Sequence, residues 1–262
     1  MSAAAAASAL FTRDIRAVVK SRSQLYSSIF TPLLILVFLG NGVSEGLAPA
    51  NLTAGNFTAY LVAGVVVMTS VFSATFSSAS YYRDRDSGIL RMFLSSPQSP
   101  RVILLGKSLA GVLIGALQAL AVLLAAAPFV EFEWQYGVIT GVLIAIAAIV
   151  LLNVMLAGVA QALASRIQTM QGFHLVMNLA LFPALFFSGA FFPVDGLPIW
   201  LELMSRVNPL SYAVDALELA AYADGSEGFF GLALDFGVLG VLAVAVYLLA
   251  LARVPRLTYS GK

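Results

Sequence analysis

The sequence predicts an all-α membrane protein with six transmembrane helices, from its composition and from the length of its apolar runs. Of the 262 residues, 60% are hydrophobic and only 10% are charged, and the mean hydropathy is +0.94. A soluble domain of this length cannot bury so much apolar surface. Each of six apolar runs has about 20 residues, the length that a spanning helix needs. We expect a single transmembrane domain over 1–262, with a cytoplasmic amphipathic helix in 1–24, six spans within 25–251 and a cytoplasmic tail in 252–262.

The basic residues predict the side of the membrane on which each loop lies. The six expected spans are 25–43, 58–80, 102–127, 138–163, 172–192 and 229–251. With these spans, every Lys and Arg except Arg206 falls on the same face of the membrane. Because loops rich in Lys and Arg remain in the cytoplasm, both termini are expected there.

The segment Leu10–Ser23 predicts an amphipathic helix before the first span. Its apolar and charged side chains fall largely on opposite sides of a helix: Leu10, Phe11, Ile15, Val18 and Val19 against Arg13, Asp14, Arg16 and Lys20. Such a helix is expected to lie on the inner membrane surface, and a simple basic anchor is the alternative. We expect no cleavable signal, because the apolar run that follows the charges is too long.

A polar insert of mixed character, Tyr81–Arg101, joins the second and third spans. It begins with four charges of alternating sign and continues with Gly88 and an apolar group around Arg91. Pro97 and Pro100 end any helix there. The pattern predicts a short cytoplasmic helix, parallel to the membrane, that presents apolar side chains and charges to a partner. A loop that merely caps two spans is the alternative.

The outer segment between the fifth and sixth spans has apolar residues at helical spacing. They form two groups: Ile199, Trp200, Leu201, Leu203 and Met204, then Leu210, Tyr212, Ala213, Val214 and Leu217. Pro198 and Pro209 stand where helices begin. We expect two short re-entrant helices that dip into the outer leaflet, which requires surrounding protein or water. An amphipathic loop on the outer surface is the alternative.

Three motifs resemble those of permeases of the ABC type-2 transporter family, which includes drug-resistance and polysaccharide export permeases. The stretch from Asp86 to Pro97, DSGILRMFLSSP, is similar to E-x-G-T-L-x-x-L-x-x-[ST]-P. The other two motifs are S-G-x-x-x-P and N-P-x-x-[YW]-x-x-[DE]-x-x-[RK], which the outer segment matches through Ser188, Gly189, Pro193, Asn208, Pro209, Tyr212 and Asp215. The chain departs from the family pattern at three positions. Asp86 stands where Glu is usual, Ile89 where Thr is usual, and Glu218 where a basic residue is usual.

The resemblance implies a permease that works in the prokaryotic plasma membrane as a pair, with a homodimer expected, together with two copies of a separate ATPase. ATP and Mg²⁺ are then bound by the ATPase, and no cofactor is expected on this chain, which catalyses no reaction itself. Coupling to the ATPase is assigned to Arg83, Asp84, Arg85, Asp86, Gly88, Leu90, Arg91, Phe93, Leu94 and Pro97. A path between the first, second and fifth spans has as candidate lining Phe182, Phe186, Phe187 and Asn178, although these Phe residues could equally form a dimer seam or face lipid.

Several other chemistries are disfavoured by the sequence. Gly106-Lys107-Ser108 resembles the end of a phosphate-binding loop, but Arg101 stands where that loop needs Gly. There is no Cys and only His174, so neither thiolate nor multi-His metal sites are expected, and the net charge of +1 suggests no nucleic acid partner. An ion-driven secondary transporter would need repeats or midplane acids, and an intramembrane enzyme would need paired His or acidic residues.

The polar residues within the spans leave the substrate open. Gln118, Asn153 and Gln161 either hydrogen-bond between helices or face a path, and Gly111 and Gly115 have the spacing that allows close helix packing. Because the span cores lack charge, we expect an apolar or amphipathic substrate such as a drug or lipid. Aromatic residues also stack on sugars, so a lipid-linked polysaccharide is the alternative.

Overall fold

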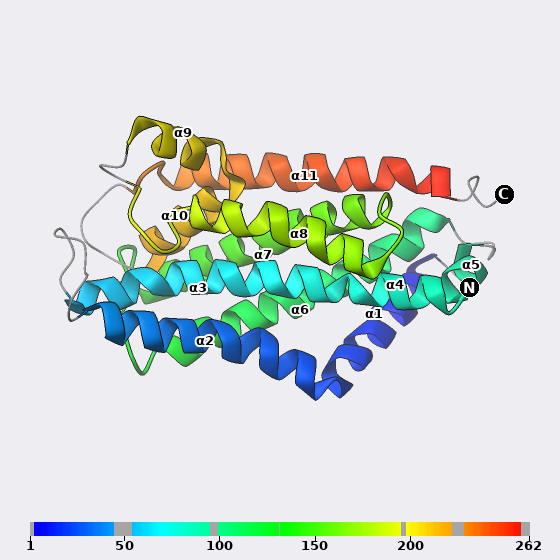
Figure 1. Ribbon diagram of the computed structural model, residues 1–262, viewed down its shortest axis with the longest axis horizontal. Coiled ribbons are helices and arrows are strands. Elements are labelled where there is room, and N and C mark those ends of the chain that lie inside the picture. The colour runs from blue at the N-terminus through cyan, green and yellow to red at the C-terminus, as the bar shows by residue number, and fades with distance from the viewer. Residues whose placement is uncertain are drawn as a thin grey trace.

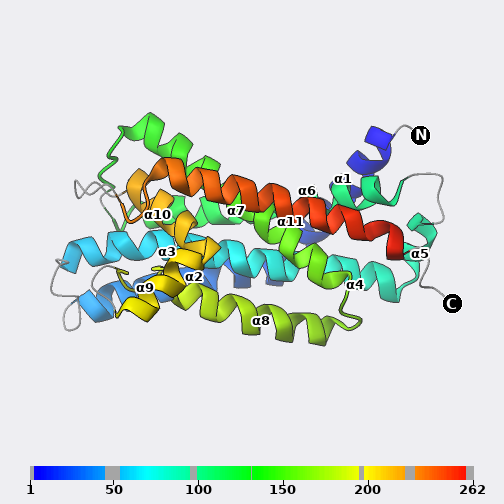
Figure 2. The same cartoon turned by 90° about the horizontal axis from the view of Figure 1, so that it is seen from above.

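The computed structural model describes residues 3–44, 54–94, 99–130, 132–194, 198–221 and 228–257, and these are almost entirely helical. The helices are α1 (Ala3–Lys20), α2 (Arg22–Ser44), α3 (Ala54–Ser77), α4 (Ala79–Asp86), α5 (Ile89–Leu94), α6 (Pro100–Ala126), α7 (Val138–Ala164), α8 (Met170–Phe186), α9 (Ile199–Val207), α10 (Pro209–Ala221) and α11 (Leu232–Leu257). The long helices lie side by side in one bundle (Figure 1). One end of the bundle carries α4, α5 and the last turns of α11, and we call it the α4 end. The opposite α9 end carries α9 and α10 (Figure 2).

Among these residues, four helical stretches are long and apolar enough to cross a membrane: Phe57–Asp86, Pro100–Ala126, Val138–Ala164 and Leu232–Ala252. The helices at the predicted first and fifth spans contain shorter apolar stretches, Ile29–Gly40 in α2 and Met170–Phe186 in α8. The structure thus confirms an all-helical membrane protein with several apolar helices. Its four long stretches coincide with the predicted second, third, fourth and sixth spans.

Two boundaries differ from the predicted ones for a local reason. The second predicted span ends at residue 80, but only Ser78 separates α3 from α4, so the helical path continues to Asp86. The fifth predicted span ends at residue 192, but α8 stops at Phe186. Pro183 lies in its last turn, and Gly189 then adopts a φ of 86°, which turns the chain away from the helix.

Helix α3 lies at the centre of the core. It packs against α2, α6, α7, α8 and α10. Its middle consists of apolar side chains that are buried on all sides, among them Val65, Val66 and Val67. A helix that is apolar all round is expected in this position. The opposite case is α11, whose Val241 and Leu248 are more than half exposed and so face lipid or another protein.

The outer segment contains two short helices with opposite environments. Helix α10 is buried against α7, α11 and α3, and Leu210, Ala213 and Leu217 belong to the core. Helix α9 presents its apolar side chains outward instead, with Ile199 83% exposed and Trp200 57% exposed. Two short helices therefore occupy the predicted positions, and they differ in how deeply they pack.

Candidate functional site

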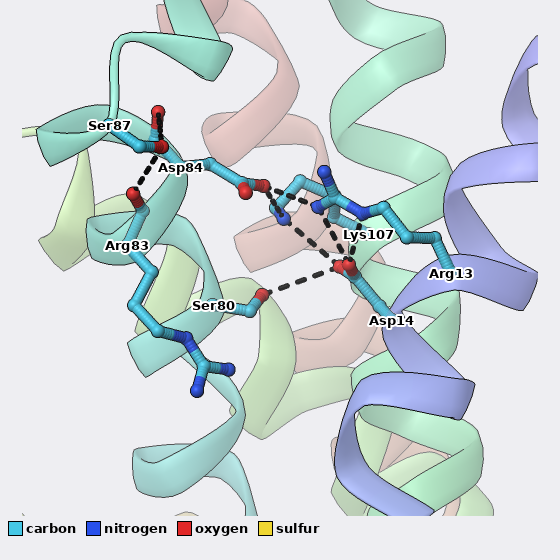
Figure 3. Close-up of polar contacts among 7 residues, drawn as sticks. All are labelled: Arg13, Asp14, Ser80, Arg83, Asp84, Ser87 and Lys107. Carbon is cyan, nitrogen blue, oxygen red and sulfur yellow. Dashed lines mark hydrogen bonds and ion pairs between the residues drawn. The ribbon is translucent and has the colours of Figure 1, made fainter. Parts of the chain in front are cut away.

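A cluster of four charged side chains from three helices lies near the α4 end (Figure 3). We call Arg13, Asp14, Asp84 and Lys107 the charged cluster. The Arg13 Nη2 atom lies 2.7 Å from Asp14 Oδ1 and 2.5 Å from Asp84 Oδ2. The Lys107 Nζ atom lies 3.0 Å from Asp14 Oδ2 and 2.5 Å from Asp84 Oδ2. Each cation thus contacts both carboxylates, and the cluster ties α1, α4 and α6 together.

The charged cluster is largely shielded from solvent and carries no net charge. Asp14, Asp84 and Lys107 are each less than one-tenth exposed, and only Arg13 reaches the surface. Burial by itself would lower the pKa of Arg13. Hydrogen bonds to Asp84 and Asp14 outweigh it and raise the pKa of the guanidinium above its ordinary value, so Arg13 stays charged. A balanced buried cluster of this kind fixes the relative positions of its helices, because each charge needs its partners.

Helix α1 reaches the cluster by packing closely on α6. Leu10, Asp14 and Val18 recur every four residues and form its buried side. At Gly106 of α6, an added Cβ would lie only 2.7 Å from the carbonyl oxygen of Ala7, so the missing side chain allows this approach. The apolar side of the predicted surface helix is therefore turned largely toward α6, with Val19 as an exposed exception.

The sequence did not predict Arg13, Asp14 and Lys107 as site residues. Arg13 and Asp14 entered only as charges of the amphipathic helix and in the count of basic residues, and Lys107 only in that count and as part of a phosphate-binding pattern. A signal did exist, since Lys107 is the single charged residue within 102–127. A lone charge inside a predicted span implies a buried partner.

Of the residues assigned to ATPase coupling, some face the interior of the chain. The carboxylate of Asp84 is used within the charged cluster. Leu90 packs in a small second core with Tyr82 and Phe173. Arg85 donates from Nη1 to the carbonyl oxygen of Ile167, at 3.4 Å. These three residues therefore hold α4 and α5 against the bundle.

Other residues of that set face outward at the corner between α4 and α5. Arg83, Asp86 and Gly88 are exposed, and the Arg83 side chain points away from the charged cluster (Figure 3). Gly88 adopts a φ of 75°, which suits glycine and lets the chain reverse after α4. We call these three residues the α4–α5 corner. Of the remaining coupling residues, Pro97 lies outside the described part of the chain, and only the helical backbone is described for Arg91, Phe93 and Leu94.

The Ser-Gly motif builds a buried turn after α8. The Ser188 hydroxyl accepts a hydrogen bond from the Ala190 N–H at 3.2 Å, and the Tyr60 hydroxyl donates to the Gly189 carbonyl. Gly64 of α3 faces the Ala190 backbone so closely that no side chain fits there. The motif therefore locks the end of α8 onto α3, and Pro193 follows it, partly exposed.

The Asn-Pro motif joins the ends of three helices. The Asn208 side chain donates to the Ala184 carbonyl at 2.5 Å and accepts from the Leu210 N–H at 3.1 Å. Pro209 is the first residue of α10, where its missing N–H costs nothing. The Tyr212 hydroxyl donates to the Arg206 carbonyl at 2.6 Å, so α8, α9 and α10 are fixed together.

Asp215 anchors the chain that leads into α11. Its buried carboxylate accepts hydrogen bonds from the backbone N–H groups of Phe229 (2.7 Å), Phe230 (2.9 Å) and Gly231 (3.2 Å). These three hydrogen bonds hold the backbone before α11 against α10. The residues predicted from the two outer motifs thus lie around the α9 end and serve as structural ties.

The candidate path residues lie along α8. Asn178, Phe182 and Phe186 are exposed and Phe187 is partly exposed, so their side chains are available to lipid, to a second copy or to a substrate. His174 lies beside the rings of Phe76 and Phe173. No group of three or more His, Cys, Asp or Glu residues that could hold a metal ion occurs in the part of the chain that the structure describes.

Comparison with known proteins assigns the bundle to a class. Residues 5–222 match the family model described as ABC-2 type transporter. Nodulation protein J of Bradyrhizobium diazoefficiens is 27% identical over 236 residues, which cover 89% of this chain and 86% of that protein. A transport permease of Pyropia yezoensis, ycf38, is 29% identical over 79% of this chain and 70% of its own length. The multidrug ABC transporter permease YbhR of Escherichia coli K12 is 24% identical over 62% of this chain and 43% of its own length.

Proposed function

Because the chain belongs to the ABC-2 type transporter family, we propose that it is the membrane subunit of an exporter driven by ATP hydrolysis on a separate subunit. Permeases of this family work with ATP-binding partner subunits. Two parts of the polar insert Tyr81–Arg101 differ in exposure, and this difference supports a partner that binds at the α4–α5 corner. The Asp84 carboxylate is bound inside the charged cluster, whereas the α4–α5 corner is exposed.

The proposed membrane arrangement follows from charge and from the bundle. Helices α2 and α8 complete six spans, and the α4 end, where the Lys and Arg residues gather, faces the cytoplasm of a prokaryotic cell. Helix α1 then lies at the inner surface with its exposed cations Arg16 and Lys20 toward lipid head groups. Helices α9 and α10 form a re-entrant pair in the outer leaflet. Two copies of the chain and two ATPases, which bind ATP and Mg²⁺, make the complete exporter.

Coupling in this proposal is mechanical. The ATPase binds the α4–α5 corner, and closure of the two ATPases pushes on α4. The charged cluster passes that displacement to α1 and α6, because none of its members can leave without stranding a buried charge. ATP binding then shifts the permease between two conformations only to the extent that the ATPase binds one of them better.

The proposed cargo is apolar or amphipathic. Phe182 and Phe186 are exposed on α8, and no charged residue lies on that helix. A relative that is described as a multidrug permease supports a drug-like substrate. A surface of this kind binds apolar molecules by burying their area rather than through ion pairs.

Co-purification tests the proposal. The chain is gently solubilised from its native membrane, and the proteins that purify with it are identified for the wild type, for Asp86→Lys and for Glu202→Lys. Glu202→Lys is the matched charge reversal at the α9 end. We expect a stoichiometric ATPase with the wild type and with Glu202→Lys, and its loss with Asp86→Lys. A homogeneous wild-type complex without an ATPase would contradict the proposal.

A further inference from the structure

Polar and very small residues recur every four positions where α3, α6 and α7 meet. The set consists of Ser73 and Ser77 on α3, Lys107, Gly111 and Gly115 on α6, and Asn153, Ala157 and Gln161 on α7. Residues four apart lie on one side of a helix, so each helix presents a stripe. The stripes face one another, because a Cβ at Gly111 would contact Ser77 and a Cβ at Gly115 would collide with Asn153.

Two hydroxyls in this seam are buried without a partner in the described structure. Ser73 Oγ and Ser77 Oγ make no hydrogen bond, whereas Thr69, Ser70 and Thr75 of the same helix each bond the carbonyl four residues earlier. The Ser73 hydroxyl is instead directed at α6, where it would lie 3.2 Å from a Cβ at position 115. Buried polar groups are nearly always hydrogen-bonded, and ordered water is the usual partner of those that the protein leaves unpaired.

One turn farther along α6, Gln118 shows the same feature. Its side chain is 5% exposed, and its Oε1 atom accepts no hydrogen bond from any described residue. The remaining polar groups of the seam are paired across helices. Asn153 Nδ2 donates to Ser70 Oγ at 3.0 Å, and the Ser108 hydroxyl bonds the Gln161 side chain.

A cavity lies in the part of the seam that contains Ser77. Its volume is about 60 Å³, and its polar lining includes Ser77, Lys107, Ser108, Asn153 and Gln161, beside small residues and the larger Tyr81 and Leu104. One ordered water needs on the order of 10–15 Å³, and cavities stay dry only when their walls are apolar. The wall of this cavity is mixed, with more apolar than polar surface, but its polar side chains offer hydrogen bonds to several waters, and it adjoins the charged cluster through Lys107.

We infer that the seam between α3, α6 and α7 is a hydrated crevice within each chain, which admits water and small hydrophilic molecules from the α4 end. The crevice lies between α3, α6 and α7, whereas the candidate path residues lie along α8, and it does not depend on the exported cargo. Its water bonds the hydroxyl of Ser77. Water also lets α3 and α6 shift against each other while this group stays hydrogen-bonded, since a mobile water can follow either helix.

The absence of Cys from the chain permits a direct test with single introduced thiols. Ser77→Cys places a thiol in the crevice with little change of size. Phe76→Cys places one beside it on the exposed outer side of α3, and Val67→Cys places one in the dry core. Each variant is treated with a charged, membrane-impermeant methanethiosulfonate in inside-out and in right-side-out vesicles. Ala157→Cys on α7 provides a second crevice position if Ser77→Cys folds poorly.

Only a thiol in contact with water ionises and reacts readily with such a reagent. We expect Ser77→Cys in inside-out vesicles to react on the order of tenfold faster than Phe76→Cys or Val67→Cys. Reaction in right-side-out vesicles alone would support the crevice while showing that the proposed orientation is wrong. Rates at positions 77 and 157 no higher than at Val67→Cys would overturn the inference.

Discussion

Lys107 neutralises two carboxylates that are almost completely buried. Its ammonium lies 3.0 Å from Asp14 and 2.5 Å from Asp84, and the Arg13 guanidinium completes the balance. Such a cluster adds little net stability compared with apolar residues of the same size, but it is costly to break. The cluster instead fixes the relative positions of α1, α4 and α6, because a shift of one of these helices would leave a charge unpaired.

Removing the Lys107 charge should therefore destabilise the protein strongly. Lys107→Met leaves two buried carboxylates with one cation, which costs about 3–5 kcal/mol. For a chain of this size we expect the midpoint of thermal unfolding in detergent to fall on the order of 10 °C. Arg206→Met is the matched control, since its exposed pair with Glu202 should contribute about 0–1 kcal/mol. Equal unfolding midpoints for the two variants would contradict the role of the cluster.

At the scale of single residues, the sequence singled out only Asp84 from the charged cluster and did not predict its partners. Asp84 was assigned to contact with a partner subunit, and the structure places its carboxylate inside the chain. Its contact Lys107 is 23 residues away, and Lys107 in turn contacts Asp14 at a separation of 93 residues. Pairings across such separations depend on how helices pack, and helical periodicity describes only one helix at a time.

Among the elements, the corner between α4 and α5 depends on the backbone of one residue. Gly88 has a φ of 75°, and nothing lies within 4 Å of where its Cβ would be. A substitution there acts through conformation alone, because there is no space to fill. Asn tolerates this left-handed conformation, whereas a β-branched residue is strained in it by about 1–2 kcal/mol.

Gly88→Val and Gly88→Asn therefore form a matched pair at the proposed docking corner. Backbone strain in the Gly88→Val variant should displace α5 and reduce the ATP hydrolysis of the purified permease–ATPase complex severalfold, while Gly88→Asn should retain most of it. Both variants should insert into the membrane normally, because the corner is exposed. The two rates are compared at equal amounts of complex, and equal rates would show that the corner geometry does not matter for coupling.

The helices themselves were largely predictable, and their ends were not. Long apolar runs predicted the helices α3, α6, α7 and α11. Composition could not show that α3 continues almost without a break into α4, because charged residues normally mark the end of a span. Composition also could not show that α10 is buried whereas α9 is exposed. Both have amphipathic patterns, and only the packing of α10 against α7 and α11 reveals which one enters the core.

At the scale of the whole molecule, different kinds of interaction hold the two ends of the bundle together. The α4 end holds the charged cluster and the exposed corner, and the α9 end is tied by neutral hydrogen bonds and by Asp215. This polarity is expected of a protein that receives a partner at one end and opens at the other. The family match shows that the chain is an ABC-2 type permease, and the asymmetry indicates the α4 end as the place where the proposed ATPase would bind.

The most direct test of this account is a cross-link from a single introduced thiol in the otherwise Cys-free chain. Asp86→Cys places the thiol at the α4–α5 corner, and Arg206→Cys places one at an equally accessible position on α9. After reaction with a short thiol-to-amine cross-linker in membranes, the account predicts an ATPase adduct from Asp86→Cys and none from Arg206→Cys. An adduct from Arg206→Cys, or none from Asp86→Cys when the ATPase still co-purifies, would contradict it.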